Sequence, residues 1–498
     1  MRFLTPALLL LAALLAGCAH PPRAESPAAV DRADANPAMV ELAIVDTTVV
    51  DVRSGALLAH RDVSVDHGRI VAIEPAGAAS ARRTVDGAGR FLIPGLWDMH
   101  VHFGGGEALV DENRDLLPLY VAHGVTTVRD AAGDLSGHVL QWRDQIARGE
   151  LQGPTLYTSG PKIEGKGSIW PGDLEVANQA ELDAALDQLQ ALHVDFVKIT
   201  DNALPTPLFE AALRGARRRG MVTSAHIPMS LSLDAVAADG LGSIEHMGYA
   251  LKSGSPREDE ISARSADGTL AYRDALTLAA DTFDETRALA AYRRLAAHGT
   301  AITPTLYGSR VTAYLDQVDH RGDDFLAYIG PGLKATYNWR VERAARDDAA
   351  AIAARHRVYE RSASLLPLLQ RAGVTVLIGT DVGFLNSYNY PGIGLHDEMR
   401  EYVRYGLTPL QTLQSATLRN AGFLGHGDES GEIAVGKVAD LVLLDADPLQ
   451  DIEATRRIQA VVLKGDYLDR AALDALLEQV RARTAQREAT YRAQPPAP

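Results

Sequence analysis

The sequence predicts an α/β fold, a (β/α)8 TIM barrel combined with a small β-sandwich domain built from both the N- and the C-terminal segments. From residue 96 onward, short apolar runs alternate with amphipathic helical patterns, which is typical of parallel β/α units. Before residue 93 and again after 425, shorter β-rich runs are separated by turn residues. The 498 residues are 46% hydrophobic and 23% charged, as in folded globular proteins.

The first eighteen residues have the layout of a secretory signal. A positive charge at Arg2 precedes an apolar run over residues 7–15 that is too short to span a bilayer permanently. The run ends in Leu15-Ala16-Gly17-Cys18, which resembles the lipobox of bacterial lipoproteins. We therefore expect residues 1–18 to be a lipoprotein signal peptide and Cys18 to be lipidated, the alternative being a chance cysteine near a cleavage site. Cys18 is the only cysteine, so the mature protein has no internal disulfide and no cysteine nucleophile.

Residues 19–40, rich in proline and alanine, predict a flexible tether that holds the folded part away from a membrane. The net charge of −15 argues against nucleic acid or an anionic lipid surface as the main partner. We expect an exported protein attached to a bacterial membrane through lipid on Cys18, on the periplasmic side of the outer membrane. The oligomeric state stays open.

Residues 41–92 are expected to form the first part of the β-sandwich and residues 426–468 the second part, with the strands of the two parts paired. The barrel is assigned to residues 93–425, with insertions at about 250–284 and 308–372 that leave its C-terminal rim. Residues 469–498 are expected to be a C-terminal helix and tail. The expected barrel strands are 96–102, 125–130, 155–159, 194–199, 222–226, 242–246, 302–306 and 374–381, and amphipathic helices between them include 180–192, 207–219 and 285–298.

The stretch from Ile93 to His102 is the first chemical motif. Side chains two residues apart in a strand point to the same face, so the imidazoles of His100 and His102 can converge on one cation. The glycines at 104–106 allow the backbone to turn away directly afterwards. An isolated His-X-His pair is weak support for a metal site, and other residues strengthen it.

Four further candidate ligands fall at or near the ends of predicted barrel strands: Lys198, His226, His246 and Asp381. Strand C-termini of such a barrel face one mouth, so residues far apart in sequence meet there. Taken singly, each histidine would be read as a hydrogen-bonded core residue and Asp381 as a helix cap. Six coincident placements favour a metal centre.

Lys198 stands in an otherwise apolar strand. A lysine that points into a barrel interior has to be neutralised, paired or modified, and loss of hydration lowers the pKa of its amine. Carbamylation by carbon dioxide would turn this amine into an anion able to bridge two cations. The alternative is a lysine that reaches solvent or forms a salt bridge.

Together these residues resemble the amidohydrolase superfamily, and in particular its imidazolonepropionase-like and prolidase-like members. The resemblance spans about residues 41–466 and is carried by Pro94-Gly95, His100-Val101-His102, Lys198, His226, His246, Gly379-Thr380-Asp381, Leu407-Thr408-Pro409-Leu410-Gln411 and Gly436-Lys437-Val438-Ala439-Asp440-Leu441. It implies two divalent metal ions, usually Zn²⁺, with His100, His102 and Asp381 on one ion, His226 and His246 on the other, and carbamylated Lys198 between them.

The resemblance implies hydrolysis, in which two divalent ions activate water and polarise a carbonyl group while Asp381 acts as general base and then acid. Deaminases of the superfamily typically carry a glutamate three residues after the histidine at position 226, and here that residue is Met229. The first hypothesis is therefore hydrolysis of an amide or peptide-type C–N bond in a small molecule such as an N-acyl amino acid or a dipeptide. The alternatives are a lactonase, carbamate or ester hydrolase, and a metal-containing surface binding protein without turnover.

Two further observations concern the substrate. Prolidase-like members often have a substrate-polarising histidine in a Gly-rich segment after the third strand, and this chain has none in residues 165–172, which departs from the dipeptidase pattern. Tyr249, three residues after His246, is a candidate substrate contact at the rim. A role in packing there is the alternative.

Overall fold

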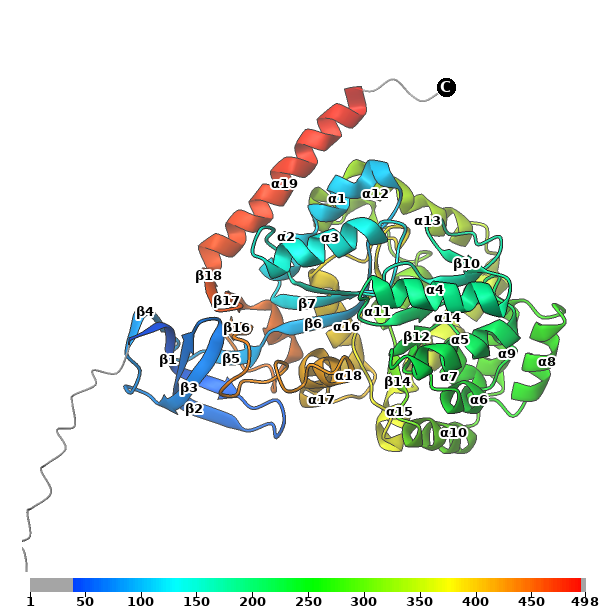
Figure 1. Cartoon of the computed structure of the whole chain (residues 1–498), viewed down its shortest axis with the longest axis horizontal. Helices are drawn as coiled ribbons and strands as arrows, with labels where there is room; N and C mark the ends of the chain where they lie inside the picture. The colour runs from blue at the N-terminus through cyan, green and yellow to red at the C-terminus, as the bar shows by residue number, and fades with distance from the viewer. Residues whose placement is uncertain (1–38, 494–498) are drawn as a thin grey trace, which may run out of the picture. The chain divides into compact units, whose positions relative to one another are not determined.

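Residues 39–493 are described by a computed structural model (Figure 1). The predicted signal peptide, the lipidation site Cys18 and nearly all of the predicted tether lie outside the described residues. No helix within 39–493 combines the length and the apolar character needed to cross a membrane.

The two ends of the described chain meet in one eight-stranded sheet, here sheet A. Its order is β18-β17-β16-β5-β1-β2-β3, with β4 paired to β1. Antiparallel pairing of β16 with β5 joins the C-terminal strands to the N-terminal ones, for example Val442 opposite Ile93. A separate cluster of buried aliphatic side chains, including Ile44, Val63 and Leu441, forms its core. The bounds are β1 Val40–Val50, β2 Leu57–Asp66, β3 Arg69–Pro75, β4 Ala81–Asp86, β5 Phe91–Pro94, β16 Leu441–Leu444, β17 Ile458–Leu463 and β18 Asp466–Asp469.

The middle of the chain forms two parallel sheets. The four-stranded sheet has the order β15-β6-β7-β8, and the six-stranded sheet has the order β10-β9-β11-β12-β13-β14. Their strands are almost entirely buried, as expected for parallel strands covered by helices on their faces. The bounds are β6 Leu96–His102, β7 Val125–Asp130, β8 Thr155–Thr158, β9 Ile163–Gly165, β10 Leu174–Val176, β11 Val197–Ile199, β12 Thr223–Ala225, β13 Ser243–Glu245, β14 Ala301–Thr303 and β15 Val382–Gly383.

Helices lie between the parallel strands and bury one apolar stripe each. The helix α5, for example, buries Phe209, Ala212, Leu213 and Ala216, spaced at helical intervals. The helix bounds are α1 Val110–Arg114, α2 Leu117–Ala122, α3 Ser136–Ala147, α4 Gln179–Ala191, α5 Thr206–Arg218, α6 Leu233–Ala238, α7 Gly248–Ser253, α8 Glu258–Ala266, α9 Tyr272–Asp281, α10 Glu285–Ala297, α11 Leu306–Ala313, α12 Pro331–Thr336, α13 Asn338–Ala344, α14 Ala349–Ala363, α15 Leu366–Ala372, α16 Ile393–Arg404, α17 Pro409–Gln414, α18 Asn420–Phe423 and α19 Arg470–Ala493.

The expected strand at 374–381 is wrong in extent. Val376 forms only an isolated parallel bridge with Ile302, and the next strand, β15, begins at Val382. The segment makes single hydrogen bonds to Ile302, Met99 and His100 in place of a continuous ladder, and its last residue, Asp381, is left-handed with φ 61°. Likewise β14 stops at Thr303, because Thr305 is left-handed and α11 begins directly after it. Both departures occur where the chain reaches the candidate site.

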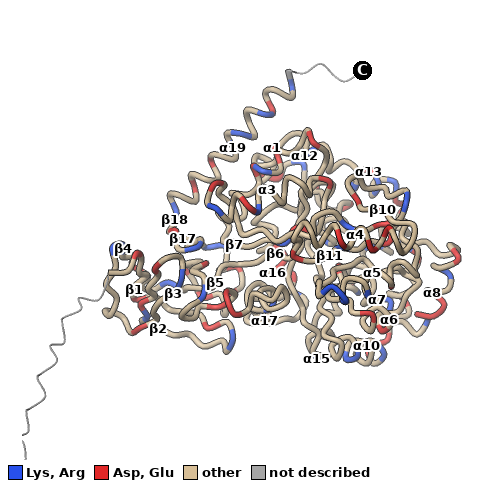
Figure 2. The backbone as a smooth tube through the Cα atoms, viewed as in Figure 1, with Lys and Arg blue, Asp and Glu red and all other residues tan. Residues whose placement is uncertain are grey.

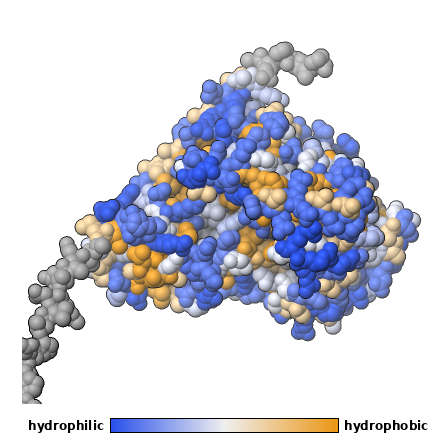
Figure 3. Space-filling view, viewed as in Figure 1, coloured by the Kyte–Doolittle hydropathy of each residue, from blue (hydrophilic) through white to orange (hydrophobic). Residues whose placement is uncertain are grey.

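The surface carries both signs of charge. Figure 2 shows basic and acidic residues interspersed along α19 and over the helices of the central region. Figure 3 shows a mostly hydrophilic face with an apolar area over sheet A, where β2 exposes Leu57 and Leu58 and β3 exposes Val71. The helix α19 packs against α2, with Val480 buried beside Leu116 and Leu119.

Candidate metal centre

The strand β6 places His100 and His102 on one face, as the alternation predicts. Their Nε2 atoms lie 3.1 Å apart. His100 is fully buried, and its Nδ1 lies 2.6 Å from Oε2 of Glu245. The Nδ1 of His102 lies 2.5 Å from the carbonyl oxygen of Ala132.

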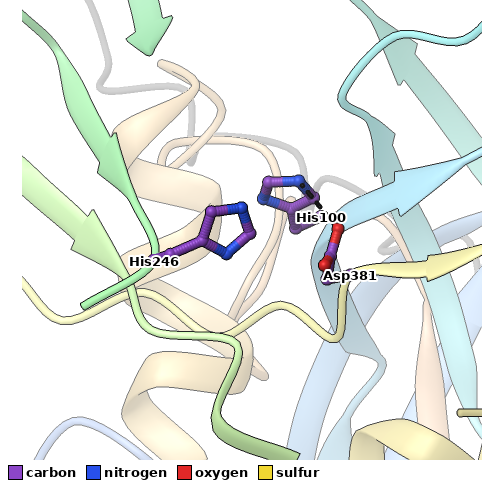
Figure 4. Close-up of side chains that lie close together, drawn as sticks. All are labelled: His100, His246 and Asp381. Atoms are coloured by element: carbon purple, nitrogen blue, oxygen red, sulfur yellow. Dashed lines mark ion pairs between the residues drawn. The ribbon is translucent and has the colours of Figure 1, made fainter. Parts of the chain in front are cut away.

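The other two histidines follow neighbouring strands directly, His226 after β12 and His246 after β13. Their Nε2 atoms also lie 3.1 Å apart, and Nδ1 of His246 lies 2.6 Å from the hydroxyl oxygen of Thr305. Figure 4 shows the imidazoles of His100 and His246 and the carboxylate of Asp381 gathered around one space. Ligand atoms of these three residues lie within 4.8 Å of one another.

Asp381 closes this group from the segment before β15. Its Oδ1 lies 3.0 Å from Nε2 of His102 and 3.4 Å from Nε2 of His100. Burial opposes ionisation of Asp381, but the contact with His102 and the surrounding histidines hold the pKa of its carboxyl well below the usual range. Asp381 is therefore a carboxylate at neutral pH.

Left-handed backbone clusters at this centre. His246, Asp381, Ala132 and Thr305 all have φ between 51° and 79°, although none is glycine. Such conformations are costly for non-glycine residues and persist where the surrounding contacts determine them. Two of these residues carry candidate ligand atoms, and the other two hold the Nδ1 atoms of His102 and His246 in place.

Lys198 projects from β11 into the same cavity. It is 1% exposed, and its Nζ has no hydrogen-bond partner among the described residues. Burial lowers the pKa of its amine to about 8. Neither solvent nor a salt bridge within residues 39–493 satisfies this amine, so the contacts argue against the two ordinary explanations for a buried lysine. Carbamylation of Lys198 stays a prediction.

A buried charged network beneath the histidines was not predicted from the sequence. Arg129 of β7 donates to Oε1 of Glu245 at 2.8 Å, and the hydroxyls of Ser224 and Ser243 donate to the same oxygen. Both ends of the Arg129–Glu245 pair are fully buried. Charged residues in apolar strands could have signalled a buried pair. The pairing of Arg129 with Glu245, and the contact of Glu245 with His100, could be recognised only once the order of the strands was known.

A second buried carboxylate ties the two halves of the centre together. Asp98 of β6 accepts hydrogen bonds from the backbone N–H and the hydroxyl of Thr380, at 2.9 and 2.7 Å. Thr380 directly precedes Asp381, so this pair sets the position of Asp381 against β6. Burial raises the pKa of Asp98 to about 7.

A cavity opens beside these residues; we call it the central cavity. Its walls include His102, Lys198, His226, His246 and Asp381, together with Lys162, Trp170, Thr200, Arg340 and Phe384. Trp170 comes from the Gly-rich segment 165–172. All six predicted ligand residues thus lie in or directly behind one cavity, and their role as ligands stays a prediction.

Tyr249 lies elsewhere. It is 4% exposed within the main hydrophobic core and is absent from the walls of the central cavity. The location corresponds to the packing alternative, and a substrate contact by Tyr249 stays a prediction. Met229 is also buried in that core, and its carbonyl oxygen accepts a hydrogen bond from Lys252.

The hydrogen bonds assign the protons of the first two imidazoles. Nδ1 of His100 faces a carboxylate and Nδ1 of His102 faces a carbonyl, so both nitrogens act as donors, and Nε2 of the neutral His100 presents a lone pair. Burial, with the charge of Lys198, lowers the pKa of His100 to about 3, and burial likewise lowers the pKa of His226 and His246. Neutral imidazole lone pairs and a carboxylate facing one another repel unless a cation lies among them. This donor set, imidazole and carboxylate, suits Zn²⁺ and similar divalent ions.

Fold and site together define an α/β protein with a candidate metal centre at the C-terminal ends of its parallel strands. Residues 91–468 match the model of the amidohydrolase family, which is more than half of the chain. The chain belongs to the amidohydrolase family.

Individual relatives are distant. Ochratoxinase of Aspergillus niger is 22% identical over 76% of this chain and 75% of its own length. Among solved structures, bottromycin amidohydrolase superposes with a TM-score of 0.67 at 22% identity, covering 89% of this chain and 90% of that one. A Xaa-Pro dipeptidase with bound methionine has a TM-score of 0.64 at 20% identity, and the match covers 86% of this chain and 99% of the dipeptidase chain. At these identities the structures establish a shared fold.

Glu245 should control metal affinity without being a ligand. Replacing Glu245 by Gln removes the negative charge that holds the proton on Nδ1 of His100, so we predict a 10- to 100-fold weaker affinity, roughly the usual effect of losing a partner behind a ligand. Competition with a chelator of known affinity measures it. Glu112→Gln, at a buried carboxylate that caps α12 instead, is the matched control. Equal affinity of Glu245→Gln and wild type would contradict the assignment.

The buried amine of Lys198 should make the stability of the metal-free protein depend on pH. Below about pH 8 the amine is protonated in both the folded and the unfolded chain. Because folding lowers its pKa from 10.5 to about 8, burial of the charged amine lowers the free energy of unfolding by about 3 kcal/mol there. Between those values the folded chain binds fewer protons than the unfolded chain, so stability rises with pH. Lys198→Met should therefore raise the free energy of unfolding at pH 7 and flatten this rise.

Urea denaturation of chelator-treated protein between pH 7 and 10 measures both effects. Lys166→Met, at a lysine with a 55% exposed side chain, should change neither. A Lys198→Met variant with the stability and the pH slope of wild type would show that the amine is not buried unpaired.

Proposed function

We propose that this protein is a metal-dependent hydrolase that cleaves an amide or peptide-type C–N bond in a small molecule, such as an N-acyl amino acid or a dipeptide. The observation that carries the proposal is the convergence of neutral imidazoles, one carboxylate and one unpaired buried lysine at the ends of parallel strands. Family membership and similarity to ochratoxinase, an amidohydrolase and a dipeptidase support it.

We also propose the details of the centre. His100, His102 and Asp381 would hold one divalent ion, His226 and His246 a second, and carbamylated Lys198 would bridge them; zinc is the proposed metal. Two ions bound there would polarise the scissile carbonyl and lower the pKa of a water molecule. The buried amine lines the same cavity as His102, His226 and His246 and has no hydrogen-bond partner in residues 39–493, which supports a bridging role for Lys198.

The chain's own groups then supply the proton transfers. Asp381 is a carboxylate that faces the central cavity, so it can accept the proton of the attacking water and deliver it to the leaving nitrogen. Glu245 and the carbonyl of Ala132 orient His100 and His102. The buried pair of Arg129 and Glu245 fixes the orientation in turn.

The parallel strands are proposed to form one closed (β/α)8 barrel. The segment 375–378 links the two sheets, because Ile302 donates to Thr375, Leu377 donates to Ile302 and Met99 donates to Ile378. On the other side, Asp195 before β11 donates to Thr158 of β8. Sheet A would be the β-sandwich domain of residues 41–92 and 426–468.

Location and partners rest on the sequence alone. We propose a small-molecule substrate, export, and attachment through lipid on Cys18 to the periplasmic side of the outer membrane.

A panel of N-acyl amino acids, dipeptides, lactones and esters tests the reaction. The zinc-loaded protein should hydrolyse C–N bonds, lose activity to a chelator and regain it with zinc. Turnover of lactones or esters alone would favour the alternative hydrolase, and tightly held metal without any turnover would favour a binding protein.

Asp381→Asn should lower kcat by a factor of about 10² to 10⁴, the range for loss of a general acid–base group. Single-turnover rates at measured metal content separate this effect from metal loss. Asp187→Asn, at an exposed carboxylate of α4, is the control. If Asp381→Asn retained more than a tenth of wild-type kcat with its metal bound, the proton-transfer role would be excluded.

A further inference from the structure

Arg340 of α13 lies where two cavities meet. One is the central cavity. The other, here the side cavity, is lined by apolar side chains such as Leu276, Leu306 and Val358 and by polar ones such as Ser309, Thr312 and Arg355. Three residues line both: His246, Asp381 and Arg340. Arg340 therefore stands next to the candidate ligands, on a segment inserted between β14 and β15.

The guanidinium of Arg340 is held in place, and its one ion pair among the described residues, with Asp381, is at the outer limit of such contacts. Its Nε donates to the carbonyl oxygen of Leu385 at 3.0 Å. One terminal nitrogen lies 4.0 Å from Oδ2 of Asp381, beyond hydrogen-bond distance. The side chain is 28% exposed, and within residues 39–493 its terminal nitrogens have no hydrogen-bond acceptor. They are available to a ligand in the cavity.

Other cationic side chains in these walls are already paired. Lys162 in the central cavity forms an ion pair with Asp173 at 2.7 Å. Arg355 in the side cavity is paired with Asp347 and, at 3.2 Å, with Asp316. Lys198 belongs to the candidate centre itself. A negative group of a ligand thus finds its partner at Arg340.

The position of Arg340 suits a carboxylate close to the reacting bond. A terminal nitrogen only 4.0 Å from the Asp381 carboxylate is near the atoms that would be attacked. In an N-acyl amino acid or a dipeptide, the carboxylate carbon lies about 2.5 Å from the scissile nitrogen, as two consecutive bond lengths dictate. A planar guanidinium can hold such a carboxylate through two parallel hydrogen bonds.

From these contacts we infer that Arg340 determines specificity by binding a carboxylate on the carbon next to the scissile nitrogen, while the side cavity takes an apolar part of the substrate. This inference rests on the proposed amide hydrolysis. In that reaction water adds to the amide carbonyl carbon and the C–N bond breaks. One product is a carboxylate, and the other is an amino acid whose amine has taken up a proton.

The test compares two amides that differ only in this carboxylate: N-acetyl-L-leucine and N-(3-methylbutyl)acetamide. Wild type should favour the first by about 100-fold or more in kcat/KM, the order expected for a desolvated charged pair. Arg340→Gln should bring this ratio to within about fivefold of one, chiefly by raising KM for the acid. Arg340→Lys should keep part of the preference. Arg343→Gln, one turn along α13 at a side chain that lies over Trp339 and outside both cavities, should behave like wild type.

Two results would overturn the inference. One is an unchanged ratio in Arg340→Gln. The other is an equal fall of kcat on both amides, which would mean that Arg340 acts on the carbonyl group common to both.

Binding measurements keep this result separate from the proposed function. Calorimetry of the zinc-loaded protein with the methylphosphonyl isostere of N-acetyl-L-leucine, and with its decarboxylated counterpart, needs no turnover. If no amide is hydrolysed but only wild type discriminates between the isosteres, the proposed function fails and the role of Arg340 stands. If wild type and Arg340→Gln bind both isosteres alike, the role of Arg340 fails.

Discussion

The centre depends on where the imidazole protons sit. Nδ1 of His100 is held by Glu245 and Nδ1 of His102 by the carbonyl of Ala132, so the two Nε2 atoms face each other at 3.1 Å. Burial keeps His100 neutral, and the pKa of Asp381 lies well below its usual range. Lone pairs and a negative charge brought together in a largely buried site are favourable only around a cation. We therefore expect the site to be complete only when a metal ion is bound.

The fold provides this arrangement through rigid parts. The proposed ligands project from the ends of β6, β11, β12 and β13 and from the segment before β15. The backbone is left-handed at His246 and Asp381, where ordinary strand geometry would have aimed the side chains elsewhere. Buried carboxylates behind the ligands, Glu245 and Asp98, hold them in position. Left-handed backbone and buried charge lower the stability of the fold, and they hold the proposed ligands in the geometry needed for metal and substrate.

Much of the fold and of the candidate site could be predicted from the sequence, because the alternation of apolar residues marks the strands and their ends. A His-X-His pair in a strand must share a face, and β6 was predicted with its observed bounds. Lys198, His226 and His246 stood at the ends of short apolar runs, and parallel strands bring such ends together. The family resemblance was confirmed by the family match.

Other parts depend on tertiary contacts that leave no local pattern. The expected strand at 374–381 forms only an isolated bridge between Val376 and Ile302, and no apolar pattern encodes this interruption of the ladder. The contact of Glu245 with His100 joins residues 145 positions apart. Arg340 sits in a helix of the long insertion, and its place beside Asp381 follows from how that insertion folds back.

Anomalous diffraction from crystals of the zinc-loaded protein, recorded at the zinc absorption edge, would locate the metal ions. We expect two anomalous peaks about 3.5–4 Å apart, the usual spacing of two-metal sites. One should lie beside His102 and Asp381 and one beside His226 and His246, with density continuous from Lys198 to both. Crystals that contain zinc only at the surface, with the four imidazoles in place and no peak among them, would contradict this expectation.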